Sequence, residues 1–200
     1  MQARRSIRGA TALLSLGFLA ACGGGDNAAA DSAAGATTSA GGADSVAGAG
    51  TGPAVNVAMI SATGQELGTL VLNETGGMIS VTGALRGLPP GDHGIHLHQG
   101  GQCTPPFESA GPHWNPTTKM HGSQNPQGPH AGDLPNITVG ADSTVNVNLT
   151  SPAGPLRGAN GLIDADGASV VVHASADDYQ TDPSGNSGAR IACGAIMTGS

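Results

Sequence analysis

The chain has 200 residues, a length that allows one domain or one domain with tails. Only 2% of the residues are aromatic and 34 are glycines, so a fold built around a large aromatic core is excluded. Fourteen acidic residues outnumber seven basic ones, three of which lie within the first eight positions, and this acidic balance argues against nucleic acid as a partner.

The N-terminal segment has the layout of an export signal. Arg4, Arg5 and Arg8 precede the apolar stretch "ATALLSLGFLA", which is too short to span a membrane. The segment closes with "LAAC", which resembles the lipobox of bacterial lipoproteins, where cleavage frees a cysteine, here Cys22, to carry lipid. Removal of residues 1–21 would leave four basic residues against fourteen acidic ones, a formal charge of −10. The alternative is an ordinary signal peptide with an incidental cysteine.

Residues 22–52 are predicted to be a lipidated cysteine followed by a flexible tether. Nearly all of them are Gly, Ala, Ser, Thr or Asp, and such a segment cannot bury a core. Three cysteines in an exported chain leave one over if two pair, and lipid on Cys22 accounts for the odd one. The expected location is the bacterial cell envelope, anchored in the outer membrane and facing the periplasm, because no Asp follows Cys22 directly.

Residues 53–200 are predicted to form one all-β domain. Short β-branched runs that partly alternate are interrupted by glycine and proline, and no helical periodicity of useful length is present. The fold class is therefore an eight-stranded sandwich or flattened barrel. The expected strands are residues 54–61, 66–74, 78–86, 93–99, 134–140, 143–149, 168–174 and 190–197.

Two long connections, residues 100–133 and 175–189, interrupt this regular pattern. Both are rich in Gly and Pro and have no strand character, and long ordered loops tend to be functional. The first contains His113, His121, His130 and Asp133, and the second follows directly on His173. Few aromatic residues are available for the core, so metal ions and a disulfide would supply additional constraint.

The stretch "HGIHLHQGGQC" at residues 93–103 concentrates histidine. In an extended strand His96 and His98 point to the same face, whereas His93 has the other parity. Two imidazoles side by side indicate a metal site. The alternative is a polar strand face with hydrogen-bonded or solvated histidines.

Five motifs together resemble copper/zinc superoxide dismutases of the bacterial exported type. They are "GDHGIHLHQGGQC", "GPHWNP", "HAGDLPN", "VVHASADD" and "GNSGARIACG", and the resemblance spans residues 54–198. It implies an eight-stranded Greek-key β-barrel with two long functional loops. It also implies one copper and one zinc ion per subunit. The implied copper ligands are His96, His98, His113 and His173, and the implied zinc ligands are His113, His121, His130 and Asp133.

The resemblance also assigns residues around the metals. Asp177 aligns with an outer aspartate that hydrogen-bonds one copper and one zinc imidazole, and His93 is expected to be a packing or supporting histidine and not a ligand. Arg190 aligns with the arginine that guides the substrate anion. Cys103 and Cys193 correspond to the family's disulfide.

The implied activity is dismutation of superoxide to oxygen and hydrogen peroxide. Copper would cycle between oxidation states, zinc would have a structural role, and His113 would join the two ions and take part in proton transfer. The expected partners are superoxide and, through lipid on Cys22, a membrane, and a homodimer is one alternative for the assembly. The rival function is an exported metal-buffering or copper-delivery module without turnover.

Overall fold

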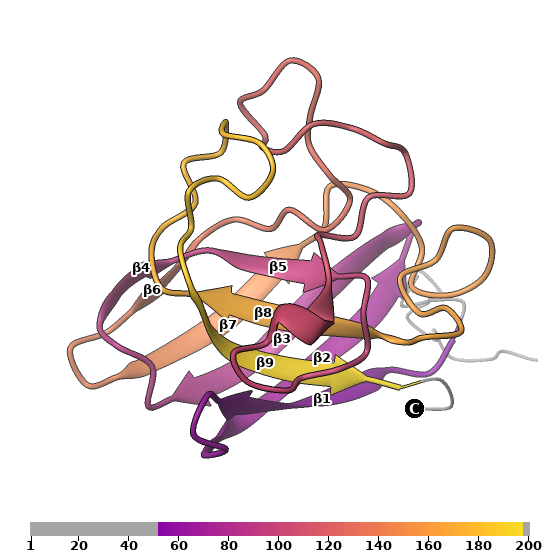
Figure 1. Cartoon of the computed structure of the whole chain (residues 1–200). Coiled ribbons are helices and arrows are strands. Elements are labelled where there is room, and N and C mark those ends of the chain that lie inside the picture. The colour runs from indigo at the N-terminus through magenta and orange to yellow at the C-terminus, as the bar shows by residue number, and fades with distance from the viewer. Residues whose placement is uncertain (1–51, 198–200) are drawn as a thin grey trace, which may run out of the picture. The chain divides into compact units, whose positions relative to one another are not determined.

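The computed structural model describes residues 52–197, so the predicted signal segment, Cys22 and nearly all of the predicted tether lie outside it. Its regular elements are nine strands and one short 3-10 helix (Figure 1). They are β1 (Val55–Ser61), β2 (Glu66–Thr75), β3 (Met78–Arg86), β4 (Gly91–His93), β5 (Ile95–His98), η1 (Glu108–Ala110), β6 (Ile137–Val139), β7 (Thr144–Thr150), β8 (Ala168–His173) and β9 (Arg190–Ile196).

The strands form one curled antiparallel sheet of seven strands and a separate pair. The order in the large sheet is β5-β8-β9-β1-β2-β3-β7, and β4 pairs with β6. The predicted all-β fold is confirmed. Most of the first long loop, residues 100–133, and the second, residues 175–189, lie above β5 in Figure 1, while the part of the first loop that carries η1 lies next to β8 and β9. In the described part of the chain, no helix is long and apolar enough to cross a membrane.

Alternating strands build the core, as the sequence pattern predicts. In β1, Val55, Val57 and Met59 are fully buried, while the residues between them face outward. Burying a side chain of this size contributes about 1.5–3 kcal/mol of transfer free energy. The aromatic contribution is small: buried Trp114 packs over Gly154, where an added Cβ would overlap the indole ring.

The predicted strand at residues 93–99 is wrong in one respect, because it is two strands. The backbone of Gly94 donates to the carbonyl of Ser175 and accepts from the N–H of His173, each at 2.8 Å. The chain therefore changes partner at this residue: His93 ends β4, which pairs with β6, and His96 begins the histidine pair on β5, which pairs with β8. This switch separates His93 from the histidines that follow it.

Candidate metal centre

Three buried histidines come from two neighbouring strands. His96 and His98 lie on β5, and His173 is the last residue of β8. β5 pairs antiparallel with β8, so that His96 lies opposite Val171 and His98 opposite Ser169. Each of the three residues is at most 3% exposed. The register of the sheet therefore places these imidazoles side by side without help from a loop.

The first long loop pairs with β5 at two of its residues. His113 forms a β-bridge with His98, and Asp133 forms one with His96. Between them, the N–H of Leu97 donates to the loop backbone at 2.9 Å, and its carbonyl accepts a hydrogen bond from the loop at 2.8 Å. This closure brings His113 and Asp133, which are 20 residues apart, next to the strand histidines.

Four imidazoles form the first cluster, with one candidate ligand atom from each residue and all of these atoms within 4.8 Å of one another. Each ring has a buried nitrogen without a hydrogen-bond partner among the described residues: His96 Nδ1, His98 Nε2, His113 Nε2 and His173 Nε2. Buried polar atoms without a partner are costly unless a ligand binds them. A set of neutral imidazole nitrogens suits copper, so this cluster fits a copper ion.

Hydrogen bonds on the far side of each ring decide which nitrogen is free. His98 Nδ1 donates to the carbonyl of Gly111 at 2.9 Å, and His173 Nδ1 likewise donates to a backbone carbonyl. His96 uses its two ring nitrogens the other way round, because its Nε2 donates to Asp177 Oδ2 at 2.9 Å and its Nδ1 is the free atom. In a neutral ring the bonded nitrogen carries the proton, so the other nitrogen keeps a lone pair for a metal.

A second cluster shares His113 with the first and adds His121, His130 and Asp133. Asp133 Oδ1 lies 2.9 Å from His113 Nδ1 and 3.1 Å from Nδ1 of both His121 and His130. Ligand atoms around a tetrahedral zinc ion with bonds of about 2.0 Å are about 3.3 Å apart. Three imidazoles and one carboxylate at this spacing fit a closed zinc site, in which His113 uses Nδ1 and keeps Nε2 for the first cluster.

The carboxylate of Asp133 is held in its charged form. Oδ2 accepts the backbone N–H groups of Gly122 and His130, each at 2.9 Å. Burial alone would raise the pKa of Asp133, but hydrogen bonds from His113, His121 and His130 outweigh burial and hold the pKa far below its ordinary value. This residue is therefore an anionic ligand at every physiological pH.

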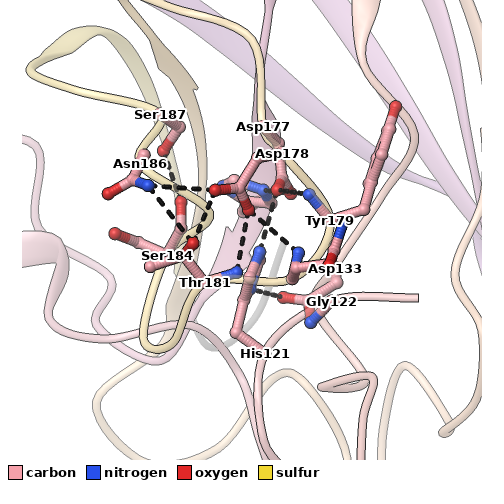
Figure 2. Close-up of polar contacts among 12 residues, drawn as sticks. His121, Gly122, Asp133, Asp177, Asp178, Tyr179, Thr181, Ser184, Asn186 and Ser187 are labelled. Atoms are coloured by element: carbon pink, nitrogen blue, oxygen red, sulfur yellow. Dashed lines mark hydrogen bonds and ion pairs between the residues drawn. The ribbon is translucent and has the colours of Figure 1, made fainter. Parts of the chain in front are cut away.

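Asp177 connects the two clusters from the second long loop. Its Oδ2 accepts a hydrogen bond from His96 Nε2. Its Oδ1 accepts from His121 Nε2 at 2.9 Å and from the N–H of Tyr179 at 2.7 Å (Figure 2). A Cβ at Gly185 would overlap this carboxylate, so the loop can pass over it only as glycine. One acid thereby orients one ring of each cluster.

The second long loop is folded around Asp178 (Figure 2). Oδ1 accepts the backbone N–H groups of Gln180 and Thr181 at 2.9 and 2.8 Å. Oδ2 accepts the Thr181 hydroxyl at 2.6 Å and the amide of Asn186 at 2.9 Å. The hydrogen bonds from Thr181 and its neighbours lower the pKa of Asp178 to about 2. The turn is thus closed by an ionised side chain that belongs to neither cluster.

A cavity of about 420 Å³ reaches the first cluster from outside. Arg190 lies on it, half-buried, and its guanidinium donates to the carbonyls of Phe107 and Gly111, each at 2.8 Å. Among the described residues, Glu108 and Arg190 are the two charged side chains of the lining. The lining residues are Glu108, Gly111, Pro112, His113, His173, Pro183, Ser184, Gly188, Ala189 and Arg190.

The two clusters differ in their electrostatics. Burial lowers the pKa of His113 to about 4 and that of His173 to about 3, so both rings are neutral at pH 7 and free to bind a metal. Burial also opposes charge on His121, but hydrogen bonds with Asp133 and Asp177 outweigh it and raise its pKa to about 9. A metal ion at the second cluster would therefore displace a proton from His121.

His93 lies outside both clusters. Its Nδ1 is 2.7 Å from the carbonyl oxygen of His173, and its Nε2 is 2.8 Å from that of Pro89. The ring therefore spans from the turn before β4 to the backbone of a residue in the first cluster. This placement supports the expectation that His93 is not a ligand.

Cys103 and Cys193 form a disulfide across 90 residues, as predicted. The bond attaches the start of the first long loop to β9, three residues from Arg190. It therefore supports the segment whose carbonyls receive the guanidinium of Arg190. The prediction for Cys22 concerns a residue outside the described range.

Two residues of the site were not singled out from the sequence. Asn136 hydrogen-bonds the backbone of Asp177, and Glu108 lines the cavity beside the first cluster. Asn136 stands in the motif "HAGDLPN", only three residues after Asp133, and this closeness to a predicted zinc ligand could have identified it as a residue of the site. Its partner is 41 residues away, and nothing local identifies that contact.

Comparison with known proteins agrees with this geometry. The family described as copper/zinc superoxide dismutase (SODC) matches residues 67–196. A superoxide dismutase-like protein of Bacillus subtilis is 42% identical over 147 residues, which are 71% of this chain and 75% of that protein. A copper/zinc superoxide dismutase of Caulobacter vibrioides is 44% identical over 138 residues, which are 66% of this chain and 79% of that enzyme.

The fold has solved counterparts as well. The structure of the Cu/Zn superoxide dismutase from Brucella abortus superposes with a TM-score of 0.59 at 32% sequence identity, covering 72% of this chain and 99% of that one. The likeness therefore extends over the sheet and both long loops.

Proposed function

The chain belongs to the copper/zinc superoxide dismutase family, and from this premise we propose which of its residues carry the reaction. Two superoxide anions and two protons become one molecule of oxygen and one of hydrogen peroxide. Bound copper supplies the reversible one-electron chemistry, and zinc, which has no redox chemistry, supplies charge and order. The observation that carries the assignment is His113, whose two ring nitrogens face two different clusters.

The clusters divide the metals between them. The four imidazoles of the first cluster would hold copper, because each has a buried nitrogen with no protein partner, and the cavity leaves one side accessible. The second cluster would hold zinc, because three imidazoles and the ionised Asp133 make a closed set of four. Asp177 would fix the orientation of His96 and His121 through their outer nitrogens.

Arg190 would capture the incoming anion. A chain with an acidic excess repels superoxide over most of its surface, so a local cation at the cavity is required. The guanidinium is held by two backbone carbonyls and no carboxylate of the described residues lies within ion-pair distance, so its charge remains available. Arg190 is therefore assigned to binding and not to metal coordination.

His113 would move a proton as well as hold the metals. Its Nε2 is buried and has no hydrogen-bond partner among the described residues, while its Nδ1 lies 2.9 Å from Asp133 Oδ1. A proton taken at Nε2 can pass to the reduced substrate, and the ring keeps its place because the other nitrogen stays bound.

The alternative function is a metal-buffering or delivery module without turnover. Storage does not require an arginine at the cavity, and Arg190 is present there. The test is a dismutase assay after loading with copper and zinc, beside Arg190→Ala and, as a control, Arg86→Ala at an exposed site on β3. We expect Arg190→Ala to keep both metals and to lose about tenfold in rate at low ionic strength, with Arg86→Ala unchanged.

One result would overturn this function, and another would overturn the role of Arg190. A loaded protein that leaves superoxide untouched would be a binding module. An Arg190→Ala variant that matches the parent rate at low salt would return Arg190 to a purely structural role.

We also propose that the mature chain is a lipoprotein acylated at Cys22 and held at the outer membrane facing the periplasm. The "LAAC" sequence after an arginine-bearing apolar stretch supports this, and the following 30 residues are long enough to separate the domain from a lipid surface. Mass spectrometry of the mature N-terminus should find a lipidated Cys22, and Cys22→Ser should release the protein without changing its metal content. An unmodified Cys22 at the terminus would contradict the proposal.

A further inference from the structure

We propose that Asn136 is a positioning residue for both metals, although it belongs to neither ligand set and, among the described residues, makes no hydrogen bond to a ligand side chain. Asn136 directly precedes β6 and is half-buried. Its side-chain amide forms two hydrogen bonds with the backbone of one residue, Asp177: Oδ1 accepts the Asp177 N–H at 2.8 Å, and Nδ2 donates to the Asp177 carbonyl at 2.9 Å. This inference rests on the two metal sites proposed above.

The paired bonds leave Asp177 little freedom. An amide side chain carries one donor and one acceptor group side by side, and here they match the two polar groups of a single peptide residue. Both bonds hold only in one orientation of the amide, so the position and the direction of the Asp177 main chain are set together. A single hydrogen bond would allow rotation about its axis, which the pair prevents.

The carboxylate of Asp177 is also held in place, because both of its oxygens accept hydrogen bonds from histidines. One oxygen serves His96 of the copper set, and the other serves His121 of the zinc set, each at 2.9 Å. A shift of the Asp177 backbone by a few tenths of an ångström would lengthen one of these bonds or strain both. Partners of this outer kind typically matter tenfold to a hundredfold in metal affinity.

The backbone of Asn136 is hydrogen-bonded to the second long loop and follows closely on the end of the first. Its N–H donates to the hydroxyl of Tyr179 at 2.8 Å, two residues beyond Asp177. It also stands three residues after Asp133, the carboxylate of the zinc set. Movement of Asp133 is therefore transmitted over a short stretch of chain to Asp177 and from there to His96. The order of the zinc set and the orientation of a copper ligand are coupled through Asn136.

The test compares two substitutions with a matched control. Asn136→Asp keeps the size and the Oδ1 acceptor but replaces the donor with an oxygen that faces the Asp177 carbonyl. Asn136→Ala removes both bonds without adding charge. The control, Asn146→Asp, makes the same chemical change at an exposed position of β7, between the buried residues Val145 and Val147. All are prepared as full chains loaded with copper and zinc.

The readouts are release of each metal to a chelator and the electron paramagnetic resonance spectrum of bound Cu(II). We expect both Asn136 variants to release zinc and copper about tenfold faster than the parent and to show a changed copper spectrum, because His96 is no longer held in one orientation. The control should match the parent in both measurements.

A purely structural role predicts something else. It would lower the melting temperatures of the metal-free and the loaded proteins equally and would leave the spectrum unchanged, and this result would overturn the proposal. Release rates within twofold of the parent would overturn it too. A parent chain that binds neither metal would instead refute the proposed function, so the two failures are distinguishable.

Discussion

The two halves of the metal centre are built in different ways. His96, His98 and His173 stand on β5 and β8, where ladder hydrogen bonds set their spacing. The rest of the ligands stand on a loop of more than thirty residues that contacts the sheet through bridges and separate hydrogen bonds. The strand half, which holds His96, His98 and His173, is therefore assembled when the sheet folds. The loop half, which holds the other ligands, depends on individual contacts.

Those contacts come from separate residues along the loop. They include the disulfide of Cys103, the bridges at His113 and Asp133, and the N–H of His121, which donates to Asp182 Oδ1 at 2.7 Å. A segment held by separate contacts opens at lower free energy than the strands of a core. We therefore expect perturbations to separate the strand half from the loop half, except at His113, which lies on the loop but belongs to both clusters.

His113→Ala should have the largest effect, because His113 is the shared residue. Both of its ring nitrogens are assigned, so its removal should lower zinc and copper content together and reduce activity to that of the metal-free protein. The control is His130→Ala, which removes a ligand of the zinc set alone. Metal analysis of the purified variants checks this. Retention of zinc by His113→Ala would contradict the assignment of His113 to both clusters, and loss of copper from His130→Ala would contradict the separation of the two clusters.

Removal of the disulfide should loosen the loop half next. The bond closes 90 residues, and chain-entropy estimates for a loop of this length give about 4 kcal/mol, so the double variant Cys103→Ala/Cys193→Ala should unfold at a markedly lower denaturant concentration. Hydrogen exchange should rise over residues 103–111 before it rises in β5. Faster exchange in β5 at the same time would show that the two halves are not independent.

Acid and base should affect the metal-free protein through different histidines. Burial lowers the pKa of His113 to about 4 and of His173 to about 3, from about 6.5 in the unfolded chain. The unfolded state then binds more protons between pH 6.5 and 3, so stability is greatest above 6.5 and falls as the pH falls, by about 1.4 kcal/mol per unit for each group. Urea unfolding of the metal-free protein along this range measures the decline.

His121 should show the reverse. Hydrogen bonds with Asp133 and Asp177 outweigh burial and raise the pKa of His121 to about 9, so its contribution is complete below pH 6.5 and is lost as the pH rises through 9. The variant His121→Asn should abolish the alkaline decline and leave the acid decline in place. A stability profile that does not change between pH 6.5 and 9 would show that His121 carries no charge in the folded state.

The smallest effect concerns the cavity. Glu108 places a negative charge in the lining that holds Arg190, so Glu108→Gln should raise the dismutase rate about twofold at low ionic strength, with the gain disappearing as salt is added. The control is Glu66→Gln at an exposed position of β2. An equal gain in the control would mean that net charge, and not the lining, controls capture of the anion.

Much of the fold could be predicted because its signals are local. The alternation of apolar residues at Val55, Val57 and Met59 predicts one buried strand face, and glycine and proline mark the long loops. The strand at residues 93–99 was predicted as one element because its pattern is continuous. The break at Gly94 arises from a change of pairing partner, which depends on β6 and β8 and leaves no local signal.

The site divides in the same way. The sequence by itself determined the chemistry, because the motifs that contain the histidines, Asp133 and the cysteines resemble a known family, and this resemblance implies two metals and a disulfide. Only the tertiary structure decided the supports: the amide of Asn136 on the Asp177 backbone, and the carbonyl of Gly111 shared by His98 and Arg190. The physical reason is that ligand types are properties of single side chains, whereas these hydrogen bonds join backbone groups far apart in the chain, and any residue type supplies a backbone carbonyl.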